Sequence, residues 1–225
     1  MRKAFRSLSL LFVFAIAMAY LEAAVVVHLR ALYSPDHPLM IFPLRLLPAS
    51  ALRVELAREL ATLVMILCAA WLAEKGVLRV FAAFLFVFGL WEIFYYAWLK
   101  LVLGWPVSWL EWDVLFLIPW AWLGPWIAPV AVAVLFVVWG AWALATEARP
   151  RITLISGILF IAGAALVLTA FLTPGFPLIA RGVEGFRDYR PETFGWGVFV
   201  PGYLAMALGL IQTVRDRRAV TPRWF

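Results

Sequence analysis

Hydrophobic residues in this chain gather in six long runs, separated by short polar or proline-rich connections. Each run holds 20 or more mostly apolar residues, and about 20 residues of α-helix cross the roughly 30 Å of hydrocarbon in a bilayer. The pattern predicts an all-α fold, a polytopic membrane helix bundle that forms a single domain over residues 1–225. The expected helices are 8–29, 51–73, 77–103, 126–145, 152–173 and 194–214.

The first run admits a second interpretation. Basic residues precede an apolar core that contains Ala17-Met18-Ala19, which is the pattern of a cleaved secretory signal peptide. The apolar run continues past that point to Val27, and this favours an uncleaved first span. The sequence leaves open whether residues 1–19 are removed.

Residues 107–125 lie between the third and fourth runs and do not form a clean span. Pro119 and the Gly124-Pro125 pair interrupt the apolar pattern, and seven of the 13 Trp of the chain fall within residues 88–125. Tryptophan favours the headgroup layer, and non-helical backbone at membrane depth is tolerated only where protein surrounds it. We therefore expect a Trp/Pro-rich interfacial or re-entrant segment between helices three and four.

The composition supports insertion in a membrane. Apolar residues make up 66% of the chain and charged residues 14%, whereas a soluble domain is nearer half apolar and a quarter charged. The net charge of +6 comes from basic residues at the ends of apolar runs, so we expect no nucleic-acid partner. Six spans place both termini on one side, and that side holds 11 of the 19 basic residues. The positive-inside rule then predicts a multi-pass protein of a bacterial-type plasma (inner) membrane, with both termini cytoplasmic.

Three of the expected helices each carry a carboxylate well inside an apolar run. Glu22 and Glu92 each lie about 15 residues from the cytoplasmic end of their helix, and Glu59 lies about eight residues from the opposite end of its own. With a rise of about 1.5 Å per residue, all three fall at a similar depth in the outer half of the bilayer. Helices joined by short turns usually pack side by side, so we expect these carboxylates to converge. A charge at that depth costs at least about 2.5 kcal/mol and needs a partner, a proton or a function.

Further polar residues fall near the same level. Arg58 is the expected charge partner of the carboxylates, and Glu55 lies one helical turn from Glu59 on the same face. Two tyrosines follow Glu92 by three and four residues, so their hydroxyls reach its side of the helix. The predicted ligand-binding site consists of Glu22, Glu59, Glu92 and Arg58, with Glu55, Tyr95, Tyr96, Asp113, Glu111 and Arg53 around them.

This pattern leaves three functional hypotheses open. The first is an outward-facing site that binds, and in one version translocates, a cation, a proton or a small polar molecule. The second is a structural subunit of a membrane complex, in which Glu–Arg pairs staple the helices together. The third is a metal- or carboxylate-dependent membrane enzyme that acts on a lipid or a periplasmic substrate.

The residue types narrow the cofactors and partners. Glu22, Glu59 and Glu92 are the candidate metal ligands, and carboxylates alone favour a hard divalent cation over zinc. The single Cys68 excludes an internal disulfide and a Cys-based zinc cluster, and the sequence carries no haem or nucleotide signature. Membrane lipid is the expected surrounding, and a membrane-protein partner or a second copy of the chain is compatible with the pattern.

Overall fold

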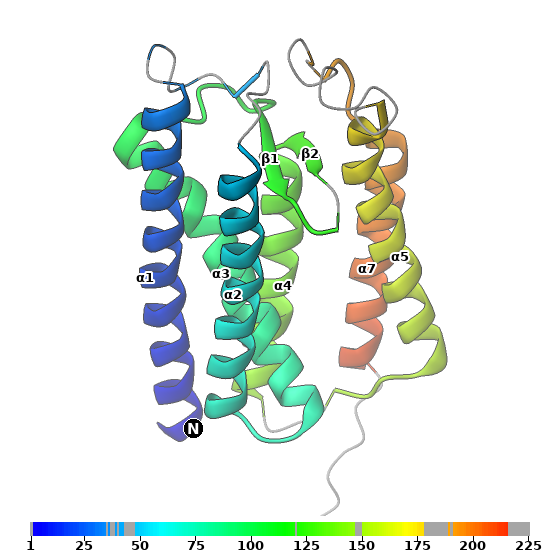
Figure 1. Cartoon of the computed structure of the whole chain (residues 1–225). Coiled ribbons are helices and arrows are strands. Elements are labelled where there is room, and N and C mark those ends of the chain that lie inside the picture. The colour runs from blue at the N-terminus through cyan, green and yellow to red at the C-terminus, as the bar shows by residue number, and fades with distance from the viewer. Residues whose placement is uncertain are drawn as a thin grey trace, which may run out of the picture.

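The computed structural model describes residues 2–34, 36, 39, 41–42, 48–119, 121–146, 150–177, 189 and 191–215. Within them, six helices are long and apolar enough to span a membrane. They are α1 (Arg2–Tyr33), α2 (Ala49–Ala73), α3 (Val77–Leu103), α4 (Ile127–Ala145), α5 (Leu154–Leu172) and α7 (Trp196–Arg215). A 3-10 turn, η1 (Thr173–Gly175), follows α5, and two strands, β1 (Trp112–Phe116) and β2 (Trp122–Pro125), lie between α3 and α4 (Figure 1).

The prediction of six spanning helices is confirmed. The bounds of α3 agree with the expected ones, while α1 begins and ends several residues beyond them. Gly104 explains why the end of α3 was predictable, because it stops the helix in the left-handed conformation, with φ 74°. Glycine adopts this conformation without steric cost and commonly terminates helices.

The helix α3 is the centre of a four-helix body and packs against α1, α2 and α4. Two glycines let α3 and α4 approach closely. A Cβ atom at Gly89 of α3 would lie 2.5 Å from the carbonyl oxygen of Ala133, and one at Gly140 of α4 would lie 2.7 Å from that of Ala82. Small residues at such contacts let membrane helices gain van der Waals packing that larger side chains would prevent.

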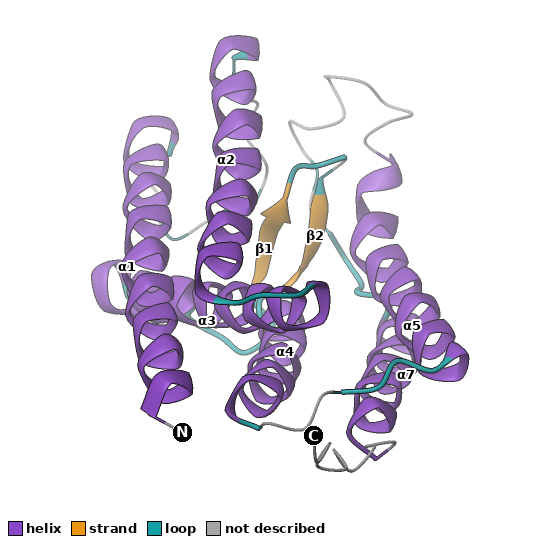
Figure 2. Cartoon of the chain, turned by 90° about the horizontal axis from the view of Figure 1, so that it is seen from below, coloured by secondary structure: helices purple, strands orange, loops and turns teal. Residues whose placement is uncertain are grey.

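The helices α5 and α7 form a second unit, and they pack chiefly against each other. Figure 2 shows them side by side, away from α1. Gly163 of α5 faces α7 so closely that an added Cβ atom would lie 2.6 Å from the carbonyl oxygen of Gly202. The indole N–H of Trp139 on α4 donates to Thr213 Oγ1 on α7 at 3.0 Å, which links the two units.

The strands β1 and β2 pair antiparallel as a short hairpin, with Val114 opposite Leu123. The hairpin lies between α2 and the α5–α7 pair in both views (Figures 1 and 2), and the ring of Trp122 stacks on Phe171 of α5 with centroids 6.2 Å apart. An interrupting segment between helices three and four was predicted, but its strand character was not. Runs of four or five apolar residues carry too weak an alternation to distinguish a strand.

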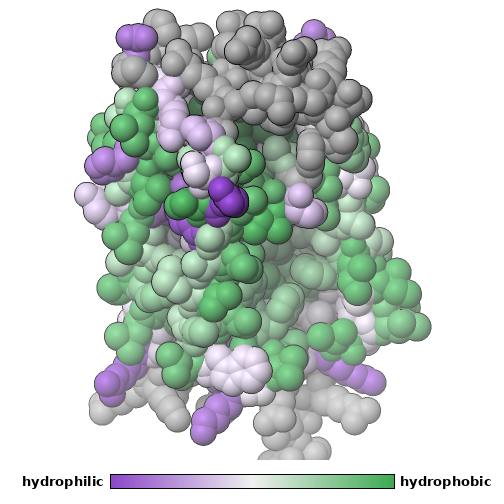
Figure 3. All heavy atoms as spheres, in the orientation of Figure 1, coloured by the Kyte–Doolittle hydropathy of each residue, from purple (hydrophilic) through white to green (hydrophobic). Residues whose placement is uncertain are grey.

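The outside of the bundle is largely apolar. Large hydrophobic side chains such as Leu72 and Val77 are almost fully exposed, and hydrophobic residues cover most of the face in Figure 3. A hydrophilic patch interrupts that face over the upper part of α2. Exposed apolar helices of this length lie in lipid, so the chain is a multi-pass membrane protein.

Candidate functional site

A cavity of about 50 Å³ lies where α1, α2, α3 and β1 meet. Its walls carry three carboxylates, Glu22 from α1, Glu59 from α2 and Glu92 from α3. Arg58 and Tyr95 add to the lining, and β1 closes one side with apolar residues. The three carboxylates that the hydropathy pattern places at a common depth therefore lie on one cavity.

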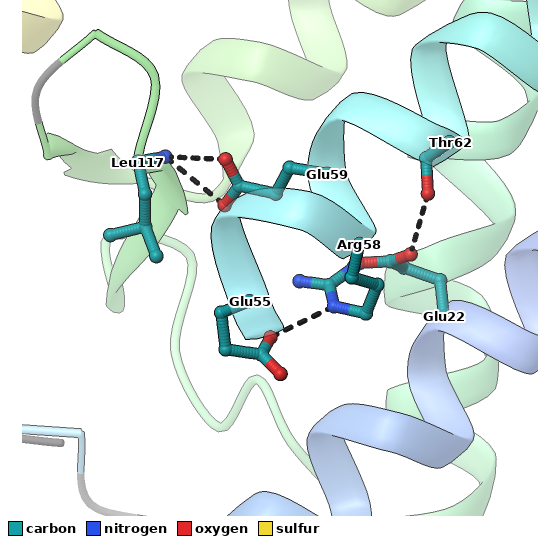
Figure 4. Close-up of polar contacts among 6 residues, drawn as sticks. All are labelled: Glu22, Glu55, Arg58, Glu59, Thr62 and Leu117. Atoms are coloured by element: carbon teal, nitrogen blue, oxygen red, sulfur yellow. Dashed lines mark hydrogen bonds and ion pairs between the residues drawn. The ribbon is translucent and has the colours of Figure 1, made fainter. Parts of the chain in front are cut away.

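Arg58 joins α1 to α2 at the edge of this cavity, as Figure 4 shows. Its Nη1 pairs with Glu22 of α1, and its Nε donates to Glu55 Oε2 at 2.8 Å, one turn away on α2. The hydroxyl of Thr62 lies 3.4 Å from the second oxygen of Glu22 and donates to it. Glu22 and Glu55 thus both have protein partners, and one guanidinium serves both.

Glu59 holds the hairpin against α2. The backbone N–H of Leu117, which directly follows β1, donates to both Glu59 carboxylate oxygens at 3.1 and 2.9 Å (Figure 4). Leu117 lies where the pairing of the two strands has ended, so its N–H has no place in the ladder. A buried backbone donor without an acceptor is costly, and the buried carboxylate of Glu59 removes that cost.

Glu92 differs from these carboxylates in its contacts. Its side chain is buried, with 8% exposed, and it makes no hydrogen bond or ion pair within the described residues. Trp91, the preceding residue, is also buried, and its indole N–H has no hydrogen-bond acceptor within the described residues. Both residues line the cavity. Because buried polar groups are nearly always hydrogen-bonded, Glu92 and Trp91 are the exceptional polar groups of this cavity.

A second polar cluster lies outside the cavity and brings together α1, α3 and β1. Tyr96 donates its hydroxyl to Asp113 Oδ2 at 3.1 Å, and Arg30 Nη2 lies 3.9 Å from Asp113 Oδ1. The guanidinium of Arg30 stacks on Trp105, 4.1 Å from the ring centroid. Burial raises the pKa of Asp113 to about 6, although Arg30, the Tyr96 hydroxyl and the N–H of Val114 all lower it.

Of the remaining predicted site residues, Tyr95 lines the cavity and Glu111, Arg53 and Tyr96 do not. Glu111 accepts two backbone N–H groups from the loop before β1, at 3.1 Å each. Arg53 is exposed and donates to the carbonyl of Ala49 on its own helix, at 3.2 Å. Tyr95 lines the cavity, whereas Tyr96 belongs to the Asp113 cluster. The predicted site residues therefore divide between the cavity, the neighbouring cluster around Asp113, and two local contacts, which are made by Glu111 and Arg53.

Sequence reasoning missed three contributors to this region. Trp91 was counted among the seven Trp of residues 88–125 and given no role, although its place next to Glu92 was a usable signal. Arg30 was left out of the predicted site, yet it is buried against Asp113 and Trp105. Leu117 contributes only its backbone N–H, for which an apolar side chain gives no signal.

A metal centre finds no support in the arrangement of side chains. Within the described residues, no group of three or more His, Cys, Asp or Glu could hold a metal ion. Glu22 and Glu59 line the same cavity as Glu92, but they accept hydrogen bonds from Thr62 and Leu117. Comparison with protein-family models, curated proteins and solved structures finds no match to the chain, so the functional argument rests on the geometry of the site.

Proposed function

We propose that this membrane protein reversibly binds a proton or a small monovalent cation at Glu92. The observation that carries the proposal is the buried Glu92 carboxylate, which faces a cavity and has no protein partner within the described residues. An isolated buried charge is so costly that it is neutralised by a proton, a counter-ion or a ligand. The cavity supplies the space in which such a species can reach the carboxylate.

The charge balance of the lining supports a positively charged ligand. Three carboxylates and one guanidinium line the cavity, which leaves an excess of two negative charges when all are ionised. Arg58 is shared between Glu22 and Glu55, and Glu59 accepts two contacts from the hairpin backbone. Glu92 is the lining carboxylate that neither a cation nor a hydrogen-bond donor contacts within the described residues, and a cation stabilises this excess of negative charge where an anion would not.

The volume of the cavity sets the size of the ligand. About 50 Å³ holds a few water molecules or one small ion with part of its hydration shell, since a single water needs roughly 10–15 Å³. Sites for metabolites and drug-sized ligands span about 300–1,000 Å³. This size favours an ion over the lipid or periplasmic substrate that the enzyme hypothesis requires.

The number of carboxylate oxygens available to coordinate an ion favours a singly charged ligand. Calcium takes six to eight oxygen ligands, and magnesium keeps near-ideal octahedral geometry. Glu92 is the lining carboxylate that no protein donor contacts within the described residues, and its two oxygens are too few for either ion. A proton needs one oxygen, and a monovalent cation can complete its shell with the cavity water.

The ion pairs of Arg58 favour a structural role for part of the same region. Arg58 ties α1 to α2, and Glu59 ties α2 to the hairpin. These contacts are those expected of a structural subunit whose helices are held together by ion pairs and hydrogen bonds. The association of the chain with a membrane-protein partner or a second copy remains a prediction. We assign stapling to Glu22, Glu55, Arg58 and Glu59, and ligand binding to Glu92.

The proposal includes an orientation of the protein in the membrane, which is inferred from the distribution of basic residues. The sequence segments 1–7, 74–79, 146–151 and 215–225, which six spans assign to one side, contain 11 of the 19 basic residues, and this supports a cytoplasmic location for that side in a bacterial-type inner membrane. Glu92 lies about 15 residues from the start of α3 on that side. The proposed site therefore lies in the half of the membrane nearer the outer face.

The test compares the wild type with Glu92→Gln and Glu74→Gln, each reconstituted in lipid nanodiscs. Glu74 is a matched control because it is paired with Arg79 at 2.7 Å near the opposite end of the bundle. Sodium, potassium and ammonium are titrated at several pH values while the unfolding temperature is followed. A ligand that binds only the folded state raises this temperature with concentration.

We expect wild type and Glu74→Gln to be stabilised by a cation or by protons in the same way. Glu92→Gln should lose the response to cations and keep only the response to protons that other groups such as Asp113 give. Stabilisation by a cation that weakens as the pH falls would show that both compete for one carboxylate. An equal response from Glu92→Gln and wild type would overturn the proposal.

A further inference from the structure

A groove of about 440 Å³ lies at the end of the bundle where α3 stops, between the last turns of α3, the loop before β1 and the start of α4. Its volume falls within the range of about 300–1,000 Å³ that is typical of ligand sites. It shares no lining residue with the Glu92 cavity among the described residues. The groove therefore stands independently of the proposed ion site.

The groove changes from apolar to polar along α3, towards the C-terminal end of that helix. Ile93, Ala97 and Lys100 are four and three residues apart and line it from one face of α3. At about 1.5 Å per residue, they cover roughly 10 Å of the helix. Val130 of α4 faces the apolar part, and the charged side chain lies near the helix end. This gradient matches a molecule with an apolar chain and a charged head.

Two stacked tryptophans form the aromatic wall of the groove. The rings of Trp109 and Trp126 lie 5.8 Å apart and are inclined by 19°. The indole N–H of Trp126 donates to the carbonyl of Ser108 at 2.8 Å, while Trp109 is largely exposed. Tryptophan in this arrangement is typical of the boundary between headgroups and acyl chains.

Lys100 supplies a fixed positive charge at the polar end. Its ammonium donates to the carbonyl oxygens of Gly104 at 3.0 Å and Pro106 at 2.7 Å. A lysine ammonium has three N–H donors, so one remains for a ligand. Glu111, the first acidic residue after Lys100 along the chain, accepts backbone N–H groups and does not line the groove.

We propose that this groove binds one anionic phospholipid, with the phosphate at Lys100 and an acyl chain along Ile93, Ala97 and Val130. Charge complementarity selects the headgroup, because Lys100 is the charged residue of the lining. The apolar stretch of α3 and α4 favours a ligand with an acyl chain, which a free phosphate or a soluble anion lacks. The exposed aromatic wall lies where the glycerol region of a lipid would be.

The test titrates delipidated protein in detergent with dioleoyl-phosphatidylglycerol or dioleoyl-phosphatidylcholine, which share their chains and differ in headgroup. Native mass spectrometry counts the lipids that stay bound. We expect one tightly retained phosphatidylglycerol on the wild type, and about fivefold weaker retention on Lys100→Gln, since one basic residue near a membrane surface contributes about a fivefold effect. Lys75→Gln is the matched control, because Lys75 is an exposed lysine near the opposite end of the bundle.

A second variant, Ala97→Phe, fills the apolar part of the groove and keeps the charge. Ala97→Phe should weaken the retention of both lipids. If Lys100→Gln does not fold, Ala97→Phe still tests the proposal. Equal retention of the two lipids by the wild type would overturn the proposal. An equal effect of Lys100→Gln and Lys75→Gln would do the same, as would unchanged binding by Ala97→Phe.

Discussion

Glu59 on α2 receives the backbone N–H of Leu117 on both of its carboxylate oxygens, at 3.1 and 2.9 Å. A helix side chain thereby completes the hydrogen bonding of a hairpin that enters the bundle from another part of the chain. Non-helical backbone at membrane depth requires such protein partners because lipid offers none. The contact gives Glu59 a structural task and separates it from Glu92, which lines the same cavity.

Replacing Glu59 with alanine should destabilise the hairpin. Leu117 would lose its acceptor while remaining in the protein. A fully buried donor left unsatisfied costs about 1–3 kcal/mol, and the partial burial of Leu117 places the expected loss at the lower end of that range. Glu59→Gln keeps one acceptor oxygen and should lose less. Hydrogen exchange of the peptide that contains Leu117 measures the effect directly. Equal protection of that amide in the wild type and Glu59→Ala would contradict the contact.

Replacing Arg58 with alanine should also destabilise the protein. It leaves Glu22 and Glu55 without their shared cation, and removing one member of a buried pair costs about 3–5 kcal/mol. The partial exposure of Arg58, 22% of its side chain, places the expected loss at or below the lower end of that range. Arg53→Ala is the control because Arg53 is exposed on the same helix and should change stability by no more than about 0.5 kcal/mol.

The free energy of unfolding measured in denaturant distinguishes these two arginine variants. A similar loss for Arg58→Ala and Arg53→Ala would show that the Arg58 pairs do not staple α1 to α2. Suppression of the Arg58→Ala defect by the additional change Glu22→Gln would support the ion pair as its cause, since it removes one of the stranded charges.

Asp113 should make the stability of the protein depend on pH. Its folded pKa of about 6 lies above the ordinary 3.8, so the folded state holds the proton to higher pH than the unfolded state does. The stabilisation is therefore complete below about pH 4 and is lost as the pH rises towards 6, by about 3 kcal/mol in total. Asp113→Asn cannot ionise and should lack this loss.

Unfolding of wild type and Asp113→Asn in denaturant at a series of pH values checks this prediction. Between about pH 4 and pH 7, the difference between the two proteins should move in favour of the variant. Glu111→Gln serves as a control on the same segment, where the carboxylate accepts local backbone N–H groups. Parallel curves for wild type and Asp113→Asn would contradict the burial of an ionisable carboxyl at this position.

The contact between α5 and α7 should not tolerate a larger side chain at Gly163. A Cβ atom there would lie 2.6 Å from the backbone carbonyl oxygen of Gly202, and overpacking of this kind typically costs about 1–3 kcal/mol. Gly157→Val on the same helix is the control, because its nearest neighbour would be 3.9 Å away. Thermal unfolding that ranks Gly163→Val no lower than Gly157→Val would argue against this packing.

The sequence predicted the spans well because bilayer thickness fixes their length and glycine fixes some of their ends. The convergence of Glu22, Glu59 and Glu92 followed from counting residues along neighbouring helices, a calculation that depends only on helical rise. Which of the three lacks a partner could not be predicted in the same way. That distinction depends on the Leu117 backbone and on the direction in which Arg58 points, and neither is written in the apolar pattern.

The Asp113 cluster shows a second limit of sequence reasoning. Asp113 was expected among the ligand-binding residues around Glu22, Glu59 and Glu92, and it contacts Arg30 and Tyr96 in a neighbouring cluster. Its position depends on the path of residues 104–116, where a short strand follows an irregular loop. Local patterns do not fix such a path, because the surrounding helices decide it.

The most direct test of the central claim is an infrared difference spectrum of the protein in nanodiscs, recorded while protons and then sodium or potassium are exchanged. The proposal predicts a carboxyl band that changes with pH or with the cation in wild type and in Glu74→Gln, and that is missing from Glu92→Gln. Identical difference spectra for wild type and Glu92→Gln would contradict it, because the exchanging group would then lie elsewhere in the chain.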